Sequence, residues 1–260
     1  MRRLCAGVLV AMVSVGTSAV ADISLLAAGG NAPFADPEWP HRGLATELVE
    51  TALKVGPDPL PHSLAWQQDV TRHPDILTAS EADIGYPWIG ADCDGAGAAT
   101  PVCRSFHFSD PIAEVAVLLF TTTEGEFDFR QIADLEGRRL CRPARHYSVR
   151  VPSSGPYEMR EAASPAACFS MLVAGDVDAV AIDEFLGVQQ LFALGLTEKV
   201  VPLPRPFGTQ TLHAVISRTH WRGTTHLYRI NAGLARLRGN GGYAEILDRH
   251  LTLYWDEIKR

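Results

Sequence analysis

Short apolar segments alternate with helical segments along most of the chain, and this alternation constrains the fold more than any other feature of the sequence. Apolar runs with strand character predict strands over residues 23–28, 62–66, 82–86, 115–120, 138–141, 179–182, 199–203 and 212–217. Helical spacing predicts helices over residues 43–55, 129–135, 163–174, 188–194, 226–237 and 243–251. Strands that alternate with helices indicate an α/β fold with mostly parallel sheets.

Two breaks in composition divide the chain. One follows Phe120, where residues 121–125 are polar, and the other is the proline-rich segment 202–206. They bracket a unit of about 85 residues, which is a plausible small domain. We therefore predict that one lobe, residues 121–206, is inserted into another lobe formed by residues 22–120 and 207–260, so that the chain crosses between lobes twice.

The first 21 residues predict a secretory signal peptide. Arg2 and Arg3 precede an apolar run over residues 4–15, and small residues at Ala19 and Ala21 suit cleavage after Ala21. The run is too short to span a bilayer, and a buried N-terminal helix is the alternative. Cys5 lies at the start of the apolar run and far from the cleavage site, so we expect a free periplasmic product of 239 residues and no lipid anchor.

The charge of the chain argues against two kinds of partner. Removal of Arg2 and Arg3 takes the formal charge from −7 to −9, and the remaining positive charges form no run of five or more. An acidic surface without basic clusters disfavours binding to nucleic acid or to anionic membranes.

Four cysteines remain after the proposed cleavage, namely Cys93, Cys103, Cys141 and Cys168. An even number in an exported chain suggests disulfides, and four cysteines allow three pairings. We favour Cys93–Cys103 and Cys141–Cys168, because each pair falls within one predicted lobe. The cysteines lack the close spacing of a zinc site and the nine histidines show no ligand spacing, so we expect no metal and no cofactor.

Five short motifs occur in an order that matches a known family. They are Ala32-Pro33-Phe34 before Gly43-Leu44, then Phe108-Ser109-Asp110-Pro111, Asp134-Leu135-Glu136-Gly137-Arg138, Gly175-Asp176-Val177-Asp178-Ala179-Val180 with Asp183, and Asn231, Leu234, Gly241-Gly242-Tyr243 and Ile246. In this order they resemble the periplasmic solute-binding proteins of amino-acid ABC transporters, the family 3 extracellular solute-binding type.

The resemblance implies the two-lobed type II periplasmic-binding-protein fold, with two hinge strands and a ligand in the cleft between lobes. Ligand binding in such a fold shifts the population toward a hinge-closed state. It also implies a monomer whose partners are a small polar solute and an ABC permease with its ATPase.

Asp183 is our candidate for the ammonium group of an amino-acid ligand. It follows a predicted buried strand at the carboxyl edge, where ligands sit in open α/β sheets, and the family uses an acid here. The alternative is a helix N-cap, and one residue can do both. Glu184 is expected to be a solvated acid in the first turn of the helix.

Arg104 is our candidate for the ligand carboxylate, which an arginine binds through a bidentate fork. The sequence departs from the family here, because the family's arginine usually lies six residues before the phenylalanine of Phe-Ser-Asp-Pro. That position is Val102, whereas Arg104 lies four residues before Phe108. A surface ion pair is the alternative for Arg104.

A second departure lies in the inserted lobe, where the family usually has Gly-Thr at the turn after its first strand. This chain has Arg142, Arg145 and His146 around that turn. A turn that leads into a helix offers backbone N–H donors to an anion, so a second carboxylate, a sulfonate or a phosphonate is conceivable. A solvated basic surface is the alternative.

Phe34, Tyr86 and Trp88 are candidates for stacking on the ligand, and Phe34 stands where the family places an aromatic wall. Core packing is the alternative for Tyr86 and Trp88. Trp39 is placed at the rim of the cleft.

We expect no catalysis, although dehydratases use the same scaffold and would need a positioned acid or base. His107, His146, Glu114 and Asp183 are available, but nothing pairs them, and no hydrolase, nucleotide-binding or zinc-protease motif occurs. A ligand-sensing accessory protein is a further alternative.

Overall fold

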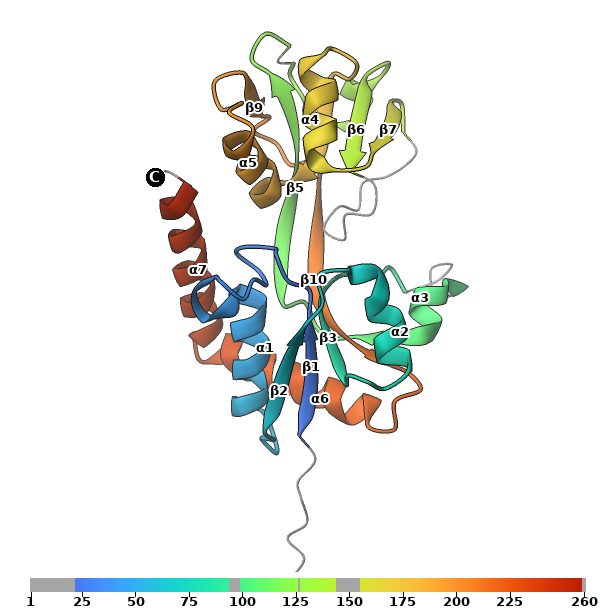
Figure 1. The fold of residues 1–260 in the computed structure, drawn as a ribbon, viewed down its shortest axis with the longest axis vertical. Helices are drawn as coiled ribbons and strands as arrows, with labels where there is room; N and C mark the ends of the chain where they lie inside the picture. The colour runs from blue at the N-terminus through green and yellow to red at the C-terminus, as the bar shows by residue number, and fades with distance from the viewer. Residues whose placement is uncertain (1–21, 94–98, 126, 144–154, 259–260) are drawn as a thin grey trace, which may run out of the picture.

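The computed structural model of the protein describes residues 22–93, 99–125, 127–143 and 155–258. These residues form a lower lobe and an upper lobe that are joined by two long strands (Figure 1). The predicted signal peptide lies outside the described residues, as do Arg145 and His146. Within the described part of the chain, no helix has both the length and the apolar character needed to cross a membrane.

The strands are β1 (Ile23–Ala27), β2 (His62–Trp66), β3 (Ile84–Ile89), β4 (Phe106–Phe108), β5 (Ala113–Thr122), β6 (Arg139–Pro143), β7 (Glu158–Ala162), β8 (Ala179–Asp183), β9 (Val200–Pro202) and β10 (Gly208–Ser217). The α-helices are α1 (Leu44–Val55), α2 (His73–Thr78), α3 (Pro101–Ser105), α4 (Pro165–Val173), α5 (Glu184–Ala193), α6 (Gly223–Gly239) and α7 (Gly242–Ile258). Short 3-10 helices cover Pro40–Arg42, Val70–Arg72 and Ile132–Leu135.

The strands form one continuous sheet in the order β2-β1-β3-β10-β5-β8-β6-β7, with β4 on β10 and β9 on β5. The pairs β1–β2, β1–β3, β6–β7 and β6–β8 are parallel. Every antiparallel pair among the described strands involves β5 or β10. The predicted parallel pairing therefore holds within each lobe, whereas the two crossing strands add antiparallel pairs.

The pairing of the two crossing strands, β5 and β10, ends at Val117. This residue is the register partner of Gly208 on β10 and of Asp183 on β8. Residues before Val117 pair within the lower lobe, and residues after it pair with β8 and β9 in the upper lobe. The predicted lobe boundaries, after residues 120 and 206, lie close to this crossing and remain a prediction.

The lower core lies mainly between the sheet and the helices α1, α6 and α7. Alternate residues of β1, Ile23, Leu25 and Ala27, point into this core, while Leu26 points to a smaller cluster on the opposite face, which α2 covers. A strand that is buried on both faces carries apolar residues at successive positions, which explains the sequence of β1.

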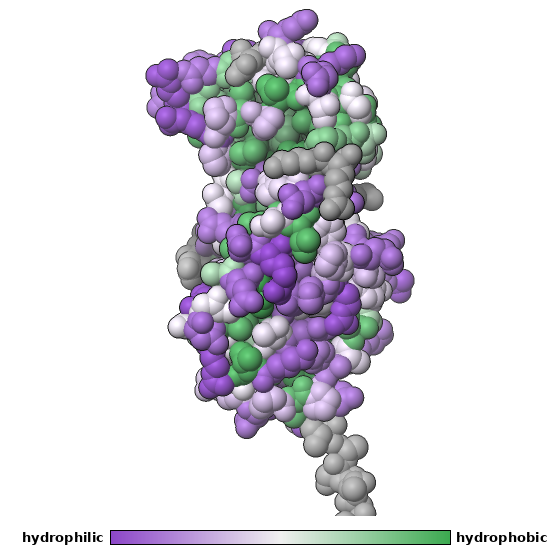
Figure 2. All heavy atoms as spheres, turned by 90° about the vertical axis from the view of Figure 1, so that its left-hand side faces the viewer, coloured by the Kyte–Doolittle hydropathy of each residue, from purple (hydrophilic) through white to green (hydrophobic). Residues whose placement is uncertain are grey.

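The upper core is separate from the lower one and contains residues from β5, β6, β8, α4 and α5. Helix α4 begins as predicted, because the Ser164 side chain accepts a hydrogen bond from the Ala167 backbone N–H and Pro165 occupies the first helical position. Helix α5 ends with exposed apolar side chains, Phe192 and Leu194. Figure 2 shows hydrophobic residues gathered on the upper lobe on this side, above a narrower waist and a more hydrophilic lower lobe.

Both predicted disulfides are present. Cys93 pairs with Cys103, with a Cα–Cα distance of 5.5 Å, and Cys141 pairs with Cys168 at 5.6 Å. The first bond fixes α3 to the segment after β3, and the second ties β6 to α4. Each lobe is therefore cross-linked within itself, and neither bond restrains the movement of one lobe against the other.

The close packing of α6 on α1 yields a first prediction. A Cβ added at Gly233 would fall on the backbone of Ala52, whereas one added at Gly239, near the end of the same helix, would meet nothing within 4 Å. We expect Gly233→Ala to lower the free energy of unfolding by about 1–3 kcal/mol, as overpacking does. Gly239→Ala should be neutral or slightly stabilising. Urea denaturation measures both, and equal effects would contradict the packing described.

Candidate ligand site at the crossing strands

Asp183 occupies the junction between the upper sheet and the crossing strands. It is the last residue of β8 and follows four fully buried apolar residues, Ala179 to Ile182. Its side chain is also buried and accepts a hydrogen bond of 2.9 Å from the backbone N–H of Leu186. The N-cap alternative is therefore confirmed, and it holds the carboxylate at the carboxyl edge of β8.

Glu184 differs from the expectation of a solvated acid. Its side chain is half-buried, and burial raises the pKa of its carboxyl, although a hydrogen bond from the Ala116 backbone opposes that effect. The reason is its place against the crossing strand β5, which excludes water from one side of the first turn of α5. Two acids thus lie in succession at the crossing.

Aromatic side chains join the lobes beside these acids. The Phe185 ring, on α5, lies 5.1 Å from the Phe34 ring and 5.1 Å from the Tyr254 ring, both in edge-to-face geometry. Trp255 lies 5.8 Å from Phe185, so the end of α7 reaches the start of α5 (Figure 1). The Tyr254 hydroxyl also donates to the Phe185 carbonyl.

The predicted aromatic residues occupy three different environments. Phe34 is 3% exposed and packs on Phe185, which places it next to the segment that begins at Asp183. Tyr86 is fully buried in the lower core, so a ligand would reach it only after neighbouring side chains moved. Trp88 is half-buried, packs on Phe106 and donates from Nε1 to His73.

Trp39, placed at the cleft rim from the sequence, is fixed to the lower lobe. Its Nε1 donates to Nδ1 of the buried His250, and its ring contacts Tyr254. It therefore packs against α7, one side chain away from Phe185.

Arg104 lies on α3, at the edge of the lower lobe that faces away from α7 in Figure 1. Its side chain is exposed and lines an open depression together with Cys93, Cys103 and Arg218. No hydrogen bond or ion pair joins its guanidinium to another described residue. The surface ion pair considered from the sequence is thus absent among the described residues, and a role in binding carboxylate stays a prediction.

Arg142 has a partner on the neighbouring strand. Its Nε donates to Glu161 Oε1 at 2.9 Å, and the two residues are register partners on β6 and β7. Part of the basic character predicted at this turn is therefore neutralised by Glu161. Arg145 and His146, the other two residues of that prediction, lie outside the described residues.

The structure therefore brings Phe34 to the segment of Asp183. Trp88 and Arg142 make contacts elsewhere, and Arg104 lies exposed on α3. Sequence reasoning missed Phe185, Tyr254 and Trp255, although an aromatic residue two positions after a candidate ligand acid was a usable signal. The sequence around Tyr254 and Trp255 does not indicate their contact with Phe185, because that contact depends on where the end of α7 lies in the folded chain.

Comparison with known proteins gives likeness in structure only. No protein-family model matches the sequence, and no curated protein matches it either. The GluR0 ligand-binding core in complex with L-glutamate has a TM-score of 0.67 at 15% identity, with 90% of this chain and 99% of that chain covered.

Two further solved structures are similar. A histidine kinase sensor domain with similarity to periplasmic binding proteins has a TM-score of 0.65 at 18% identity, over 88% of this chain and 96% of the other. The ancestral amino acid-binding protein AncCDT-1, a precursor of cyclohexadienyl dehydratase, has a TM-score of 0.60 at 14% identity, over 88% and 94%. The chain therefore has the two-lobed fold of type II periplasmic-binding proteins, in agreement with the motifs in its sequence.

The burial of Glu184 yields a second prediction. Because its pKa is raised above the ordinary value of 4.5, the folded protein holds this proton more tightly than the unfolded chain does. The stability that the protonated carboxyl contributes is present below that value and is lost as the pH rises through the raised folded-state pKa. Glu184→Gln should therefore be more stable than wild type at pH 7, and the difference should shrink as the pH falls through the raised pKa and level off below pH 4.5.

Urea denaturation across that pH range measures the effect. Glu114→Gln, which neutralises an exposed acid on β5, is the control and should keep the wild-type dependence on pH. A difference between Glu184→Gln and wild type that stays constant at every pH would contradict the prediction.

Proposed function

We propose that the protein captures a small polar ligand, an amino acid or a related charged solute, between its two lobes. One observation carries the proposal. A buried carboxylate, Asp183, lies in register with Val117, the last residue of β5 that pairs with β10. An acid at this place is suited to a ligand ammonium group, because a buried charge requires an opposite charge or hydrogen bonds.

The acidic pair strengthens this assignment. Asp183 and Glu184 follow one another beside β5, and neither side chain is more than half-exposed. A cation that binds there is attracted by both carboxylates, and its charge stabilises the ionised form of Glu184. The ligand that fits best carries an ammonium or a guanidinium group.

The carboxylate end of the ligand is assigned to basic groups on both lobes. Arg104 offers a guanidinium on the lower lobe, and Arg142, Arg145 and His146 are the candidates on the upper lobe. Because Arg142 already binds Glu161, Arg104 is the stronger of the two described arginines. Phe34, Tyr86 and Trp88 remain candidate walls for the rest of the ligand, with Phe34 the nearest to Asp183.

Delivery to an ABC permease and its ATPase in the periplasm is the role that the sequence motifs support. A sensory role is the second candidate, because a histidine kinase sensor domain shares the fold over 96% of its length. The likeness to AncCDT-1 keeps a dehydratase-like role open as a third.

Glu114 and His107, two of the residues considered for acid–base catalysis, lie far apart. Glu114 pairs with Thr211 and His107 with Ile216, five register positions apart along β10. At about 3.3 Å per residue the two backbones are about 17 Å apart, beyond the reach of a shared proton. The function we propose is binding without chemistry, and this separation supports it for Glu114 and His107.

A thermal-shift screen of the mature protein against amino acids, dicarboxylates, sulfonates and polyamines tests the proposal. A ligand at a hundredfold over its Kd should stabilise the folded state by about 2.7 kcal/mol. If only sugars or polyamines raised the melting temperature, the amino-acid assignment would be wrong.

Asp183→Asn separates the charge of this residue from its capping role, which gives a third prediction. Asparagine caps a helix about as well as aspartate, so the ligand-free stability should remain close to wild type while the ligand-induced shift disappears. Ser164→Ala, which removes the cap of α4, is the matched control. It should lose about 1 kcal/mol and keep the shift. Wild-type affinity in Asp183→Asn would remove this residue from the site.

A further inference from the structure

A second group of polar side chains gathers at the opposite end of the lower lobe from the crossing strands. Asp83 directly precedes β3, His220 lies between β10 and α6, and His226 lies in the first turn of α6. One ligand atom from each residue lies within 4.8 Å of the other two. The sequence gives no sign of this group, because 137 positions separate Asp83 from His220.

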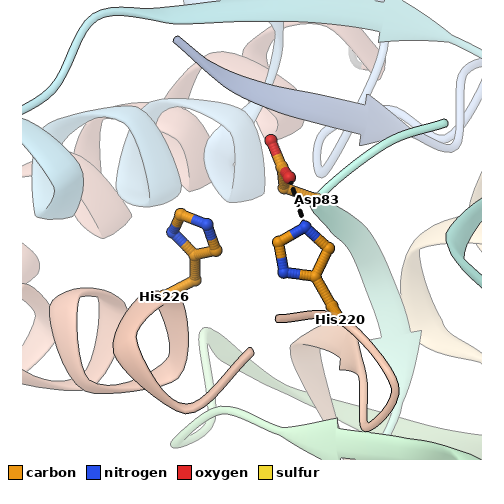
Figure 3. A group of neighbouring side chains, drawn as sticks. All are labelled: Asp83, His220 and His226. Atoms are coloured by element: carbon orange, nitrogen blue, oxygen red, sulfur yellow. Dashed lines mark ion pairs between the residues drawn. The ribbon is translucent and has the colours of Figure 1, made fainter. Parts of the chain in front are cut away.

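The three side chains point toward one another. His220 Nε2 lies 2.7 Å from Asp83 Oδ1, and Figure 3 shows the His226 ring turned toward that pair from α6. His220 and His226 are 7% and 2% exposed, whereas 18% of the Asp83 side chain reaches solvent. The group is thus buried at its two histidines and reaches solvent mainly at the carboxylate.

Asp83 is held in place from behind. Its Oδ2 accepts hydrogen bonds from the Ser24 backbone N–H at 2.7 Å and from the Ser24 hydroxyl at 2.8 Å. These bonds leave Oδ1 directed at the histidines. A carboxylate that is oriented by outer hydrogen bonds is the usual form of a metal-binding acid.

His226 is the least satisfied of the three. Its Nδ1 is buried without a hydrogen-bond partner, and no hydrogen bond of its other ring nitrogen is recorded among the described residues. A buried ring nitrogen without a hydrogen-bond partner calls for an explanation, and a bound ion would supply one.

We propose that Asp83, His220 and His226 form a binding site for a divalent transition-metal ion, with zinc the best match. Two imidazoles and one carboxylate make a ligand set that suits zinc, with a water in the fourth position. At bond lengths of about 2.0–2.2 Å, tetrahedral ligand atoms lie about 3.3 Å apart. The ligand atoms here must adjust by only about 1.5 Å or less to reach that spacing.

Two terms oppose the metal. The neighbouring cations Arg222 and Arg229 repel a second positive charge, although the Arg222 guanidinium lies over the ring of the exposed Trp221. Coordination through Nε2 of His220 also moves the ring proton to Nδ1, which now accepts a long hydrogen bond of 3.2 Å from the Arg222 backbone. The long Arg222 hydrogen bond and the 2.7 Å pair between His220 Nε2 and Asp83 Oδ1 are therefore exchanged for three coordinate bonds.

A bound ion would tie together parts of the lower lobe that are distant in sequence. Through Asp83 and Ser24 it would connect the starts of β3 and β1 to the turn before α6. The site lies at the N-terminal edge of the parallel strands, away from Asp183, so the expected role is structural. This proposal stands independently of the proposed ligand site.

The test is zinc binding to the untagged, EDTA-treated protein. Equilibrium dialysis measures the stoichiometry, and thermal shift measures the stabilisation. We expect one equivalent of Zn²⁺ to bind and to raise the melting temperature, while Mg²⁺ does neither, because Mg²⁺ prefers oxygen ligands. Cobalt in place of zinc should give the visible absorption of a tetrahedral site with nitrogen and oxygen ligands.

The variants are His226→Gln and Asp83→Asn. Each should weaken zinc binding by more than about 100-fold, since the loss of even an outer partner of a ligand costs 10–100-fold. Asp83→Asn keeps an acceptor for Ser24, so it provides a folded variant if His226→Gln does not fold. His107→Gln is the control, because His107 packs near Gly223 at the start of α6 but contributes no ligand atom.

Zinc binding of wild-type strength in both ligand variants, equal loss in His107→Gln, or the absence of stoichiometric binding to wild type would each overturn the proposal. In those cases the Asp83–His220 pair serves only as a buried ion pair within the lower lobe.

Discussion

The pairing of β5 with β10 is the constraint on which the rest of the structure depends. Both strands run through the waist, and their backbone hydrogen bonds join the lower and upper halves of the sheet at Val117 and Gly208. Because Asp183 is the next register partner of Val117, the candidate ligand acid is fixed to the strands that connect the lobes. A bend at the waist would therefore move the lower-lobe side chains relative to Asp183 more than it would move Asp183 relative to β5.

Much of the fold could be predicted from the sequence where a single element carries its own signal. Helix α1 has a complete apolar stripe, α4 has a serine cap and a proline, and β8 is buried on both faces. Helix α2, with six residues, is too short for a periodic pattern, and β7 is an edge strand with a largely polar sequence. Strand β10 begins earlier than predicted, because its polar start at residues 208–211 pairs with β5 at the waist.

The candidate sites were predictable to different degrees for a physical reason. Asp183 could be found because a buried strand, an acid and a helix follow one another in the chain. The aromatic contact of Phe185 with Tyr254 and the group of Asp83, His220 and His226 could not, since each joins segments that only the folded chain brings together. The expectation that Glu184 is solvated was wrong for the same reason. The strand that partly buries it, β5, lies more than 60 residues earlier in the sequence.

The end of α7 gives the molecule one more property. Trp255 belongs to the lower lobe by its helix and lies 5.8 Å from the Phe185 ring of the upper lobe, on a face that is partly open to water. Any change in the separation of the lobes alters how much of this indole water can reach. The intrinsic fluorescence of Trp255 is therefore expected to report the separation of the lobes, although the residue need not contact a ligand.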